Sequence, residues 1–593
     1  MHDTQQAQRP ASAESEYNVL TPGAPQAEDA TALRKIAVFV THGMGQQVPF
    51  TTLDAVFEQL RRLPPFASAR PEAETIQLDG QQLQRLVLRL PSLGREIHFY
   101  EGYWAPLTEG EVTLRDISRF LLHAGVNGIL NSTTTFSRWI FGRWQSYDIP
   151  VRTWAYLVVA LATIGALAII NTVVAVVSAA RATIGVAPPT WLSDALFCDL
   201  TTTLNLLLVV ASAFVVSLAL TRLARRIRLR WLRTGLGFLS VGLFTLTLLA
   251  TVLAGLALPL LILSHLQHGG AWAPGMVRWS SVLGRHGAER LNNWCSAAFL
   301  ALPVVALAYA GASWAWKFLT ASRSQLGARR EAQQPLSSLL VLAALVIGTG
   351  LIVLEVVALW PWGAEGDTHW PLRLLVTWVV VLLLSGGVRR FLVQYLGDVA
   401  VYVESHTVDR FSELRARIRA CVTDRARAIY AATGPAAYAN VVVVGHSLGS
   451  VVSYDALNQL LCEDAIDRQA GRPARDVARR TPLFLTFGSP LDKTAFIFAI
   501  QHRRTTQARE ALAASSQPML QDYAWRPERW VNIYSPWDII SGALEYFDLP
   551  NAADPRRVTN RRDGDATTFL MAHVEYWEDP MLPQVLSEVL TAA

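Results

Sequence analysis

The sequence contains a serine in a glycine-flanked turn, at the point where a buried strand gives way to a helix. Residues 440–444 are an asparagine followed by four valines, a composition typical of a fully buried strand. They lead directly into Gly445-His446-Ser447-Leu448-Gly449, and residues 450–461 have a helical pattern. Small neighbours allow a sharp turn that projects the Ser447 hydroxyl above the sheet, and the following helix N-terminus favours negative charge there. In this context the serine is predicted to be a nucleophile.

A serine nucleophile needs a general base, and the base needs an acid that orients it. In proteins with this turn the chain order is serine, then acid, then histidine. His573 is the only histidine downstream of Asp538, and Asp538 follows the predicted strand 530–534, where such an acid belongs. Asp492 and Asp548 stay open as alternatives, since the first also follows a strand and the second lies further along the same loop.

Acyl transfer also needs hydrogen-bond donors for the negative oxygen that develops in the transition state. One predicted donor is the backbone N–H of Leu448, the residue after the nucleophile. The predicted strand 35–40 ends in a glycine-rich turn, and the N–H of Gly43 or Met44 in that turn is the expected second donor. Four further residues are expected to shape the two turns: His42, Gly445, His446 and Gly449.

The elements that must position these turns come from both ends of the chain. Strands are predicted over residues 35–40, 86–90, 97–100, 440–444, 483–487 and 530–534. A solvated, charged helix is predicted over 398–432 and a last helix over 583–590. Because residues 1–32 are rich in Gln, Ala, Pro and Glu, we expect a disordered tail there, and we expect one domain formed from 33–150 and 397–593.

Residues 151–396, between these two parts, have the composition of a membrane protein. The whole chain of 593 residues is 51% apolar and 17% charged, against about 25% charged in soluble proteins. Of its 99 charged residues only 24 lie among the 244 positions 153–396. Stretches of about 20 apolar residues are long enough to cross a bilayer as helices. Six spans are predicted: 153–180, 200–221, 236–263, 291–316, 336–360 and 372–388.

Basic residues in the loops between these spans predict the orientation in the membrane. Fifteen lysines and arginines flank the spans on one side and five on the other, and the richer side is expected to be cytoplasmic. Strands on both sides of the block must join one sheet, which requires an even number of crossings, so that the segments 336–360 and 372–388 either both cross or neither does. Both soluble parts are therefore expected in the cytoplasm, with the spans in a bacterial inner (plasma) membrane.

The remaining composition argues against several other functions. The net charge of +5 comes from the arginines that flank the spans, so we expect no nucleic-acid partner. Four scattered cysteines, at 198, 295, 421 and 462, suit neither a disulfide scaffold nor a CxxC metal site. We therefore expect no metal and no cofactor.

Taken together, these residues resemble the α/β-hydrolase superfamily, and within it the lipase-like branch. Residues 445–455 look like the elbow of intracellular phospholipases, and 488–491 and 532–538 are similar to segments that those families carry after later strands. The resemblance covers about 33–104 and 397–593, whereas the membrane block departs from the soluble lipases. It implies a mostly parallel sheet flanked by helices and metal-independent serine ester hydrolysis, with Ser447, Asp538 and His573 as the triad.

The expected function is that of a membrane-embedded serine hydrolase acting on acyl esters. A site tethered at the bilayer favours phospholipid, lysolipid or acylglycerol substrates. Three alternatives stay open: a thioesterase, an acyltransferase with the same triad, and a transporter, receptor or scaffold whose hydrolase-like domain is not catalytic. The sequence does not predict an oligomeric state.

Overall fold

The computed structural model describes most of the two ends of the chain and three long helices of the middle. The described ranges are 18–19, 33–44, 48–108, 111, 114–131, 135–181, 192–226, 230–267, 279–284, 286–288, 290–292, 402, 409–500, 507–569 and 572–592. The predicted spans 336–360 and 372–388, and all but the start of 291–316, lie outside them. The chain divides into a sheet unit (Met1–Val158, Ala224–Gly237 and Arg390–Ala593) and a helical unit (Val159–Leu223 and Phe238–Arg389).

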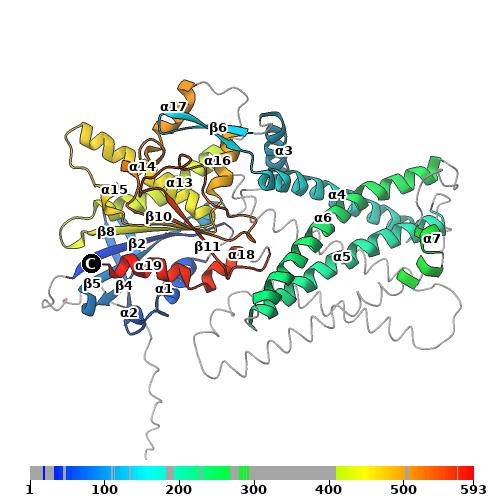
Figure 1. Cartoon of the computed structure of the whole chain (residues 1–593), viewed down its shortest axis with the longest axis horizontal. Coiled ribbons are helices and arrows are strands. Elements are labelled where there is room, and N and C mark those ends of the chain that lie inside the picture. The colour runs from blue at the N-terminus through cyan, green and yellow to red at the C-terminus, as the bar shows by residue number, and fades with distance from the viewer. Residues whose placement is uncertain are drawn as a thin grey trace, which may run out of the picture. The chain divides into compact units, whose positions relative to one another are not determined.

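The sheet unit is built on one large twisted sheet (Figure 1). Among the described residues it has nine strands, in the order β1-β3-β4-β5-β2-β8-β9-β10-β11, and all neighbours are parallel except β3–β4 and β4–β5. The strands are β1 (Asn18–Val19), β2 (Arg34–Thr41), β3 (Pro71–Leu78), β4 (Gln81–Leu90), β5 (Arg95–Gly102), β8 (Asn440–His446), β9 (Phe484–Phe487), β10 (Trp530–Tyr534) and β11 (Val558–Arg562). The expected mostly parallel sheet with flanking helices is confirmed.

Strands from the two ends of the chain meet at the centre of this sheet. β2 pairs in parallel with β8, with Ile36 opposite Asn440 and Thr41 opposite Gly445. Both strands are almost wholly buried, which explains their runs of β-branched apolar residues. The parallel register brings the carboxyl ends of β2 and β8, and the turns that follow them, to the same edge of the sheet.

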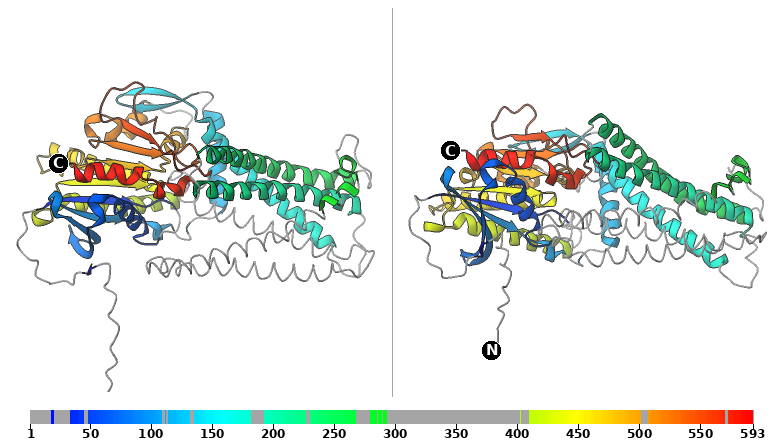
Figure 2. Two further views of the ribbon diagram at one scale, coloured as in Figure 1. Left: turned by 60° about the horizontal axis from the view of Figure 1, so that its bottom comes forward. Right: turned by 90° about the horizontal axis from the view of Figure 1, so that it is seen from below.

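Helices cover both faces of the sheet. The helices are α1 (Thr51–Leu60), α2 (Pro64–Ala67), α3 (Leu114–Asn131), α13 (Asp409–Ala431), α14 (Leu448–Gln469), α15 (Val477–Arg480), α16 (Leu491–Ile500), α17 (Gln507–Ser515), α18 (Ala572–Glu575) and α19 (Met581–Thr591). Alternate β2 residues such as Val38 join the core under α1 and α19. Thr41 faces the other side, where its hydroxyl accepts a hydrogen bond from Ser453 of α14. Figure 2 shows α19 lying along the sheet.

Several elements were not predicted from the sequence. They include β3, β11, the helices α1, α3, α16 and α17, and a hairpin of β6 (Thr135–Ile140) and β7 (Arg143–Asp148). Within the tail predicted to be disordered, Asn18 and Val19 instead pair with Glu72 and Ala73 of β3. The edge of β3 offers unpaired backbone groups, and two extended residues are enough to bond with them. The rest of 1–32 lies outside the described residues.

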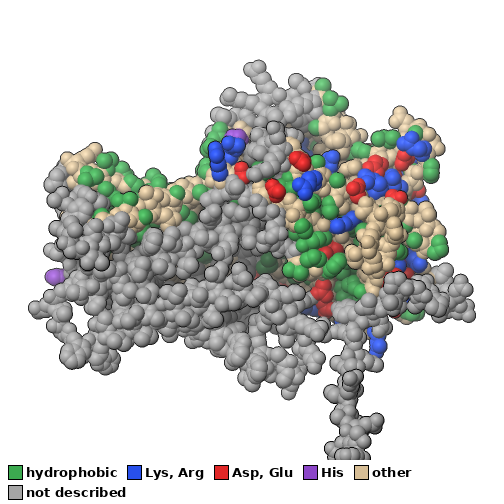
Figure 3. Space-filling view, turned by 180° about the vertical axis from the view of Figure 1, so that it is seen from behind, with side chains coloured by type: hydrophobic (Ala, Val, Ile, Leu, Met, Phe, Trp, Pro, Cys, Tyr) green, Lys and Arg blue, Asp and Glu red, His purple; other side chains and the backbone are tan. Residues whose placement is uncertain are grey.

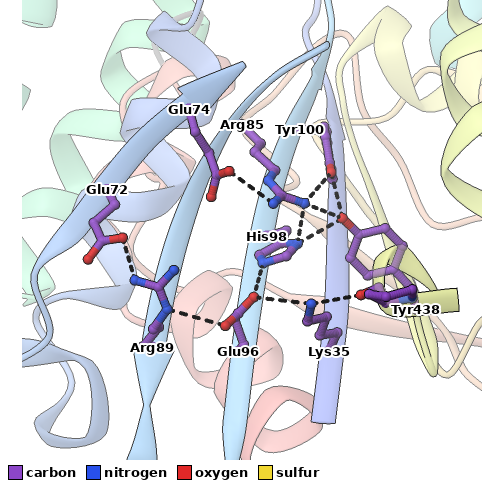
Figure 4. A network of polar contacts seen from close by, with 10 residues as sticks. Lys35, Glu72, Glu74, Arg85, Arg89, Glu96, His98, Tyr100 and Tyr438 are labelled. Carbon is purple, nitrogen blue, oxygen red and sulfur yellow. Dashed lines mark hydrogen bonds and ion pairs between the residues drawn. The ribbon is translucent and has the colours of Figure 1, made fainter. Parts of the chain in front are cut away.

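A polar network ties the antiparallel strands to the loop that precedes β8 (Figure 4). Arg85 of β4 forms an ion pair with Glu74 (3.1 Å) and donates a hydrogen bond to the Tyr438 hydroxyl (3.0 Å). The same hydroxyl lies 2.7 Å from Nδ1 of His98, whose Nε2 contacts Glu96. Because Tyr438 lies just before β8, the network links the two chain segments that make the sheet.

The helical unit supports the predicted membrane block in part. Its main helices are α4 (Val151–Arg181), α5 (Asp194–Arg226) and α6 (Arg230–Gln267), with a short α7 (Trp279–Val282). Among the described residues, three segments are long and apolar enough to cross a membrane: Val158–Val177, Ala195–Phe214 and Thr234–Gln267. α4 and α6 approach closely, since a Cβ added to Gly255 would lie 2.7 Å from the Cα of Ala166.

The surface of these helices is apolar. Large side chains of α6 point outward, among them Phe238 (67% exposed) and Leu256 (57%), an exposure that suits lipid rather than water. In Figure 3 charged side chains gather on one part of the described surface, while the helical part shows almost none.

Candidate active site

Ser447 lies in a strained turn between β8 and α14. It precedes the first residue of α14 with φ 52° and ψ −131°, a region that non-glycine residues rarely occupy. Such a conformation costs on the order of 1–3 kcal/mol and persists only where the surroundings impose it. Here the Ser447 N–H donates to the carbonyl of Phe487 (3.0 Å), and its own carbonyl accepts from the Ser450 N–H (3.0 Å). The strain is therefore held by hydrogen bonds on both sides of the serine.

The glycines around Ser447 are required by close packing. A Cβ on Gly449 would lie 2.5 Å from the Thr41 carbonyl oxygen, and one on Gly445 would lie 2.6 Å from the Cα of Ser450. A Cβ on Gly43 would lie 2.7 Å from the Cβ of Ser447. The turn after β2 and the turn after β8 therefore touch, as the sequence predicted for a nucleophile beside its oxyanion turn.

His573 joins Ser447 to Asp538. Its Nε2 lies 2.9 Å from Ser447 Oγ, and its Nδ1 lies 2.9 Å from Asp538 Oδ2. All three residues are buried. An ionised carboxylate can only accept, so Nδ1 carries the proton and Nε2 is free to accept from the serine hydroxyl. The three residues predicted from chain order thus form one hydrogen-bonded chain, with His573 on α18.

The carboxylate of Asp538 is kept ionised by its neighbours. Burial by itself raises the pKa of Asp538, but the adjacent His573 imidazole, the Ile540 N–H (2.8 Å) and Ser541 outweigh burial and lower the pKa to about 2. The Tyr576 hydroxyl adds a further hydrogen bond to Oδ2 (3.0 Å). Among the described residues, the groups that lower the pKa of this carboxylate all donate hydrogen bonds to it.

Neither alternative acid contacts His573. Asp492 accepts the N–H of Tyr546 (3.1 Å), and burial raises its pKa to about 7. Asp548 forms an ion pair with the buried Arg526 (2.6 Å).

His42 orients the turn that follows β2. Its Nε2 accepts the N–H groups of Trp104 (2.9 Å) and Ala105 (3.2 Å), so the proton lies on Nδ1, which donates to the Gly43 carbonyl (2.8 Å). Burial lowers the pKa of His42 to about 4, which keeps the ring neutral. In a trans peptide the N–H points opposite to the carbonyl. The Met44 N–H is therefore directed away from the His42 ring.

His446, inside the elbow, supports the short helix α18 that carries His573. Its Nε2 lies 3.4 Å from the His573 carbonyl, and its ring packs edge-on against Trp577 (4.9 Å between centroids). Burial lowers the pKa of His446 to about 3, so the ring is neutral and packs as an aromatic side chain. These contacts agree with the prediction that His446 supports the turn and is not the general base.

Tyr576 is a member of the site that the sequence did not reveal. Besides Asp538, its hydroxyl contacts the N–H of Ser535 (2.8 Å) and the hydroxyl of Ser541 (2.7 Å). A Cβ on Gly488, a residue with φ +60°, would lie 3.1 Å from the Tyr576 ring. The segments 488–491 and 532–538, which carry the resemblance to lipases, both contact this tyrosine. No spacing in the sequence indicates that Tyr576 belongs to the site.

No family model, curated protein or solved structure was found to match the chain. Within the described ranges, no group of three or more His, Cys, Asp or Glu side chains is arranged to hold a metal ion.

Proposed function

We propose that the chain is a membrane-embedded serine hydrolase of the α/β-hydrolase type that cleaves acyl esters, with lipid esters as its substrates. The observation that carries the proposal is the hydrogen-bonded chain from Ser447 through His573 to Asp538, with the serine in a strained turn. Structural ion networks also bury histidines and aspartates, but they do not need a serine at positive φ between a strand and a helix.

In the proposed first step, Nε2 of His573 takes the proton of the Ser447 hydroxyl as Oγ attacks the ester carbonyl carbon. The negative oxygen accepts hydrogen bonds from the N–H groups of Leu448 and Met44. Leu448 opens α14, where backbone N–H groups have no partner within the helix. The intermediate then expels the alcohol, which takes the proton from His573, and the acyl group stays on Ser447.

In the second step water attacks the acyl-serine. His573 accepts the proton of the water and then gives it to Ser447 Oγ as the bond between the acyl group and the serine breaks and the acid is released. Asp538 holds Nδ1–H throughout and stabilises the imidazolium that forms in each step. Tyr576 acts as a positioning residue, because it contacts Asp538 and not the reacting atoms.

We also propose that the membrane spans are an insertion in this hydrolase domain. β2 and β8 are neighbours in one sheet although the helical block separates them in sequence. One sheet cannot form across a bilayer, so the number of crossings must be even. Three candidate spans are described, and the proposal therefore requires an odd number more, for which the sequence predicts three. With the arginine bias, both soluble parts face the cytoplasm of a bacterial inner membrane.

Labelling with a fluorophosphonate probe tests the proposal, because such probes phosphonylate activated serines. The full chain in detergent should gain one adduct, mapped to Ser447 by peptide mass spectrometry. Ser447→Ala should abolish the adduct, while Ser68→Ala, a change at an exposed serine of the same unit, should retain it. Absence of labelling in a folded protein would favour a non-catalytic binding module.

Once labelling has identified the serine, further assays test which molecule accepts the acyl group and which kind of ester is cleaved. Transfer of the acyl group to an added alcohol in preference to water would identify an acyltransferase, and faster cleavage of thioesters than of oxygen esters would identify a thioesterase.

A further inference from the structure

A cavity lies inside the sheet unit, along α14. Its volume is about 590 Å³, within the range of small-molecule sites. It follows one face of α14 from Val451 to Cys462, a length of about 16 Å at 1.5 Å per residue. Ser447 and His573 are not among the residues that line it, so it is separate from the site described above.

The charged residues of this cavity are mainly basic. It is lined by Arg138, Arg415 and Arg419, against one acid, Asp455. Arg415 already has a partner, since its Nη2 lies 3.2 Å from Asp455 Oδ2. Among the residues that the structure describes, no carboxylate lies within ion-pair distance of Arg138 or Arg419. Within the described residues, the lining of the cavity therefore carries a net positive charge.

Arg138 is held in place by its neighbours, whereas Arg419 is exposed. Arg138 donates to the Tyr546 carbonyl and lies over the Phe547 ring, 5.1 Å from its centroid. That bond uses one of the five N–H donors of the guanidinium, which leaves others for a ligand. Arg419 follows Arg415 by four residues and so lies on the same face of α13.

Apolar side chains form another part of the wall. They include Val451 on α14, Leu491 and Phe498 on α16, and Phe547. Guanidinium groups suit carboxylate and phosphate, whereas aliphatic and aromatic surfaces suit a hydrocarbon. A small inorganic anion would bind only to the guanidinium groups, and a neutral lipid would contact only the apolar wall.

We propose that this cavity binds an anionic amphiphile, a molecule with one carboxylate or phosphate group on an apolar chain. A fatty-acid anion and a lipid phosphate both have this chemistry. The proposal does not depend on hydrolysis at Ser447, because none of the residues that line the cavity takes part in that reaction.

Calorimetric titration of the full chain carrying Ser447→Ala, in phosphatidylcholine nanodiscs, tests the proposal without turnover. The ligands are octanoate, octyl phosphate, octanol and inorganic phosphate, with empty nanodiscs subtracted. Octanoate, octyl phosphate or both should bind at least about tenfold more tightly than octanol and inorganic phosphate, since a hydrogen bond to a charged group is worth that much. The relative affinity of the first two distinguishes carboxylate from phosphate lipid.

Arg138→Gln and Arg419→Gln should each weaken binding of the anionic amphiphile about tenfold. Arg417→Gln is the matched control, because Arg417 is exposed on the same helix and does not line the cavity. Arg419 is also exposed, so its replacement leaves folding intact even if Arg138→Gln does not. Equal affinity for octanol and octanoate, or equal affinity of the Arg417→Gln and Arg419→Gln proteins, would overturn the proposal. Tight binding of inorganic phosphate alone would overturn it as well.

Discussion

Replacement of Asp538 by asparagine changes one oxygen into an NH2 group and leaves the side-chain shape almost unchanged. In the native site Oδ2 receives hydrogen bonds from His573 and Tyr576, and Oδ1 receives one from the Ile540 N–H. Because the amide must present NH2 at one of these positions, a donor will face a donor in either orientation. The substitution therefore cannot be neutral.

The two orientations have different consequences. With NH2 toward His573, the imidazole must place its proton on Nε2, and it can no longer accept the proton of Ser447. Loss of the correct tautomer costs about ten-thousand-fold in kcat in serine hydrolases, or roughly 5 kcal/mol of barrier. With NH2 toward Ile540, a buried N–H loses its acceptor at a cost of about 1–3 kcal/mol in stability. We expect the first orientation, because the His573 ring can move its proton to the other nitrogen and then accept from the NH2 group, whereas the Ile540 N–H cannot become an acceptor.

The assay is steady-state hydrolysis of a short-chain p-nitrophenyl ester by purified full chain. Asp538→Asn should lower kcat by about 10³–10⁴ with little change in KM. Asp492→Asn is the control, because burial already raises the pKa of Asp492 to about 7 and an amide resembles its neutral form. A mild effect of Asp538→Asn beside a severe effect of Asp492→Asn would refute the reasoning and move the acid to Asp492.

Three further predictions concern packing, protonation and topology. Gly449→Ala should lower the unfolding free energy by roughly 3 kcal/mol or more, because the added Cβ meets the backbone of Thr41. Thermal unfolding measures this loss, and Gly564→Ala, which has open space around it, should not show it. Glu101 is buried, which raises its pKa to about 7. Its folded-state pKa exceeds the unfolded value, so the stability it contributes is full below about pH 4 and is lost as the pH rises through about 7; Glu101→Gln should flatten this part of the stability–pH curve, and an unchanged slope would contradict the prediction. Cysteines placed at 20, 228, 325 and 590 should be shielded from an impermeant reagent in intact cells while one at 366 reacts, and labelling at 590 with 20 shielded would break the even number of crossings.

Strands with strong burial were predicted well from the sequence, and strands without it were missed. β2 and β8 are buried along nearly their whole length, so their apolar runs were sufficient. β11 has one buried residue, Val558, and the rest of it is polar. β3 has half-buried and exposed residues between its two buried end residues. Strands at or next to the edge of a sheet pair through their backbones, so their side chains carry little pattern.

Site residues could be predicted where a rule about their order along the chain exists. Site residues that are brought together only by the fold could not be predicted. Ser447, Asp538 and His573 lie on different elements, but their order along the chain follows a known rule, and the structure brings their side chains into contact. Their catalytic roles stay predictions. Tyr576 and the cavity along α14 depend on side chains that meet only in three dimensions, and no local spacing encodes them.

The central claim is that Ser447 is the nucleophile of an ester hydrolase, and kcat/KM for a short-chain ester tests it most directly. The measurement compares the unmutated chain with Ser447→Ala and with Ser68→Ala, all shown to be folded by their thermal unfolding. We predict a loss of about 10³-fold or more for Ser447→Ala and none for Ser68→Ala. Hydrolysis by Ser447→Ala at the unmutated rate would contradict the account.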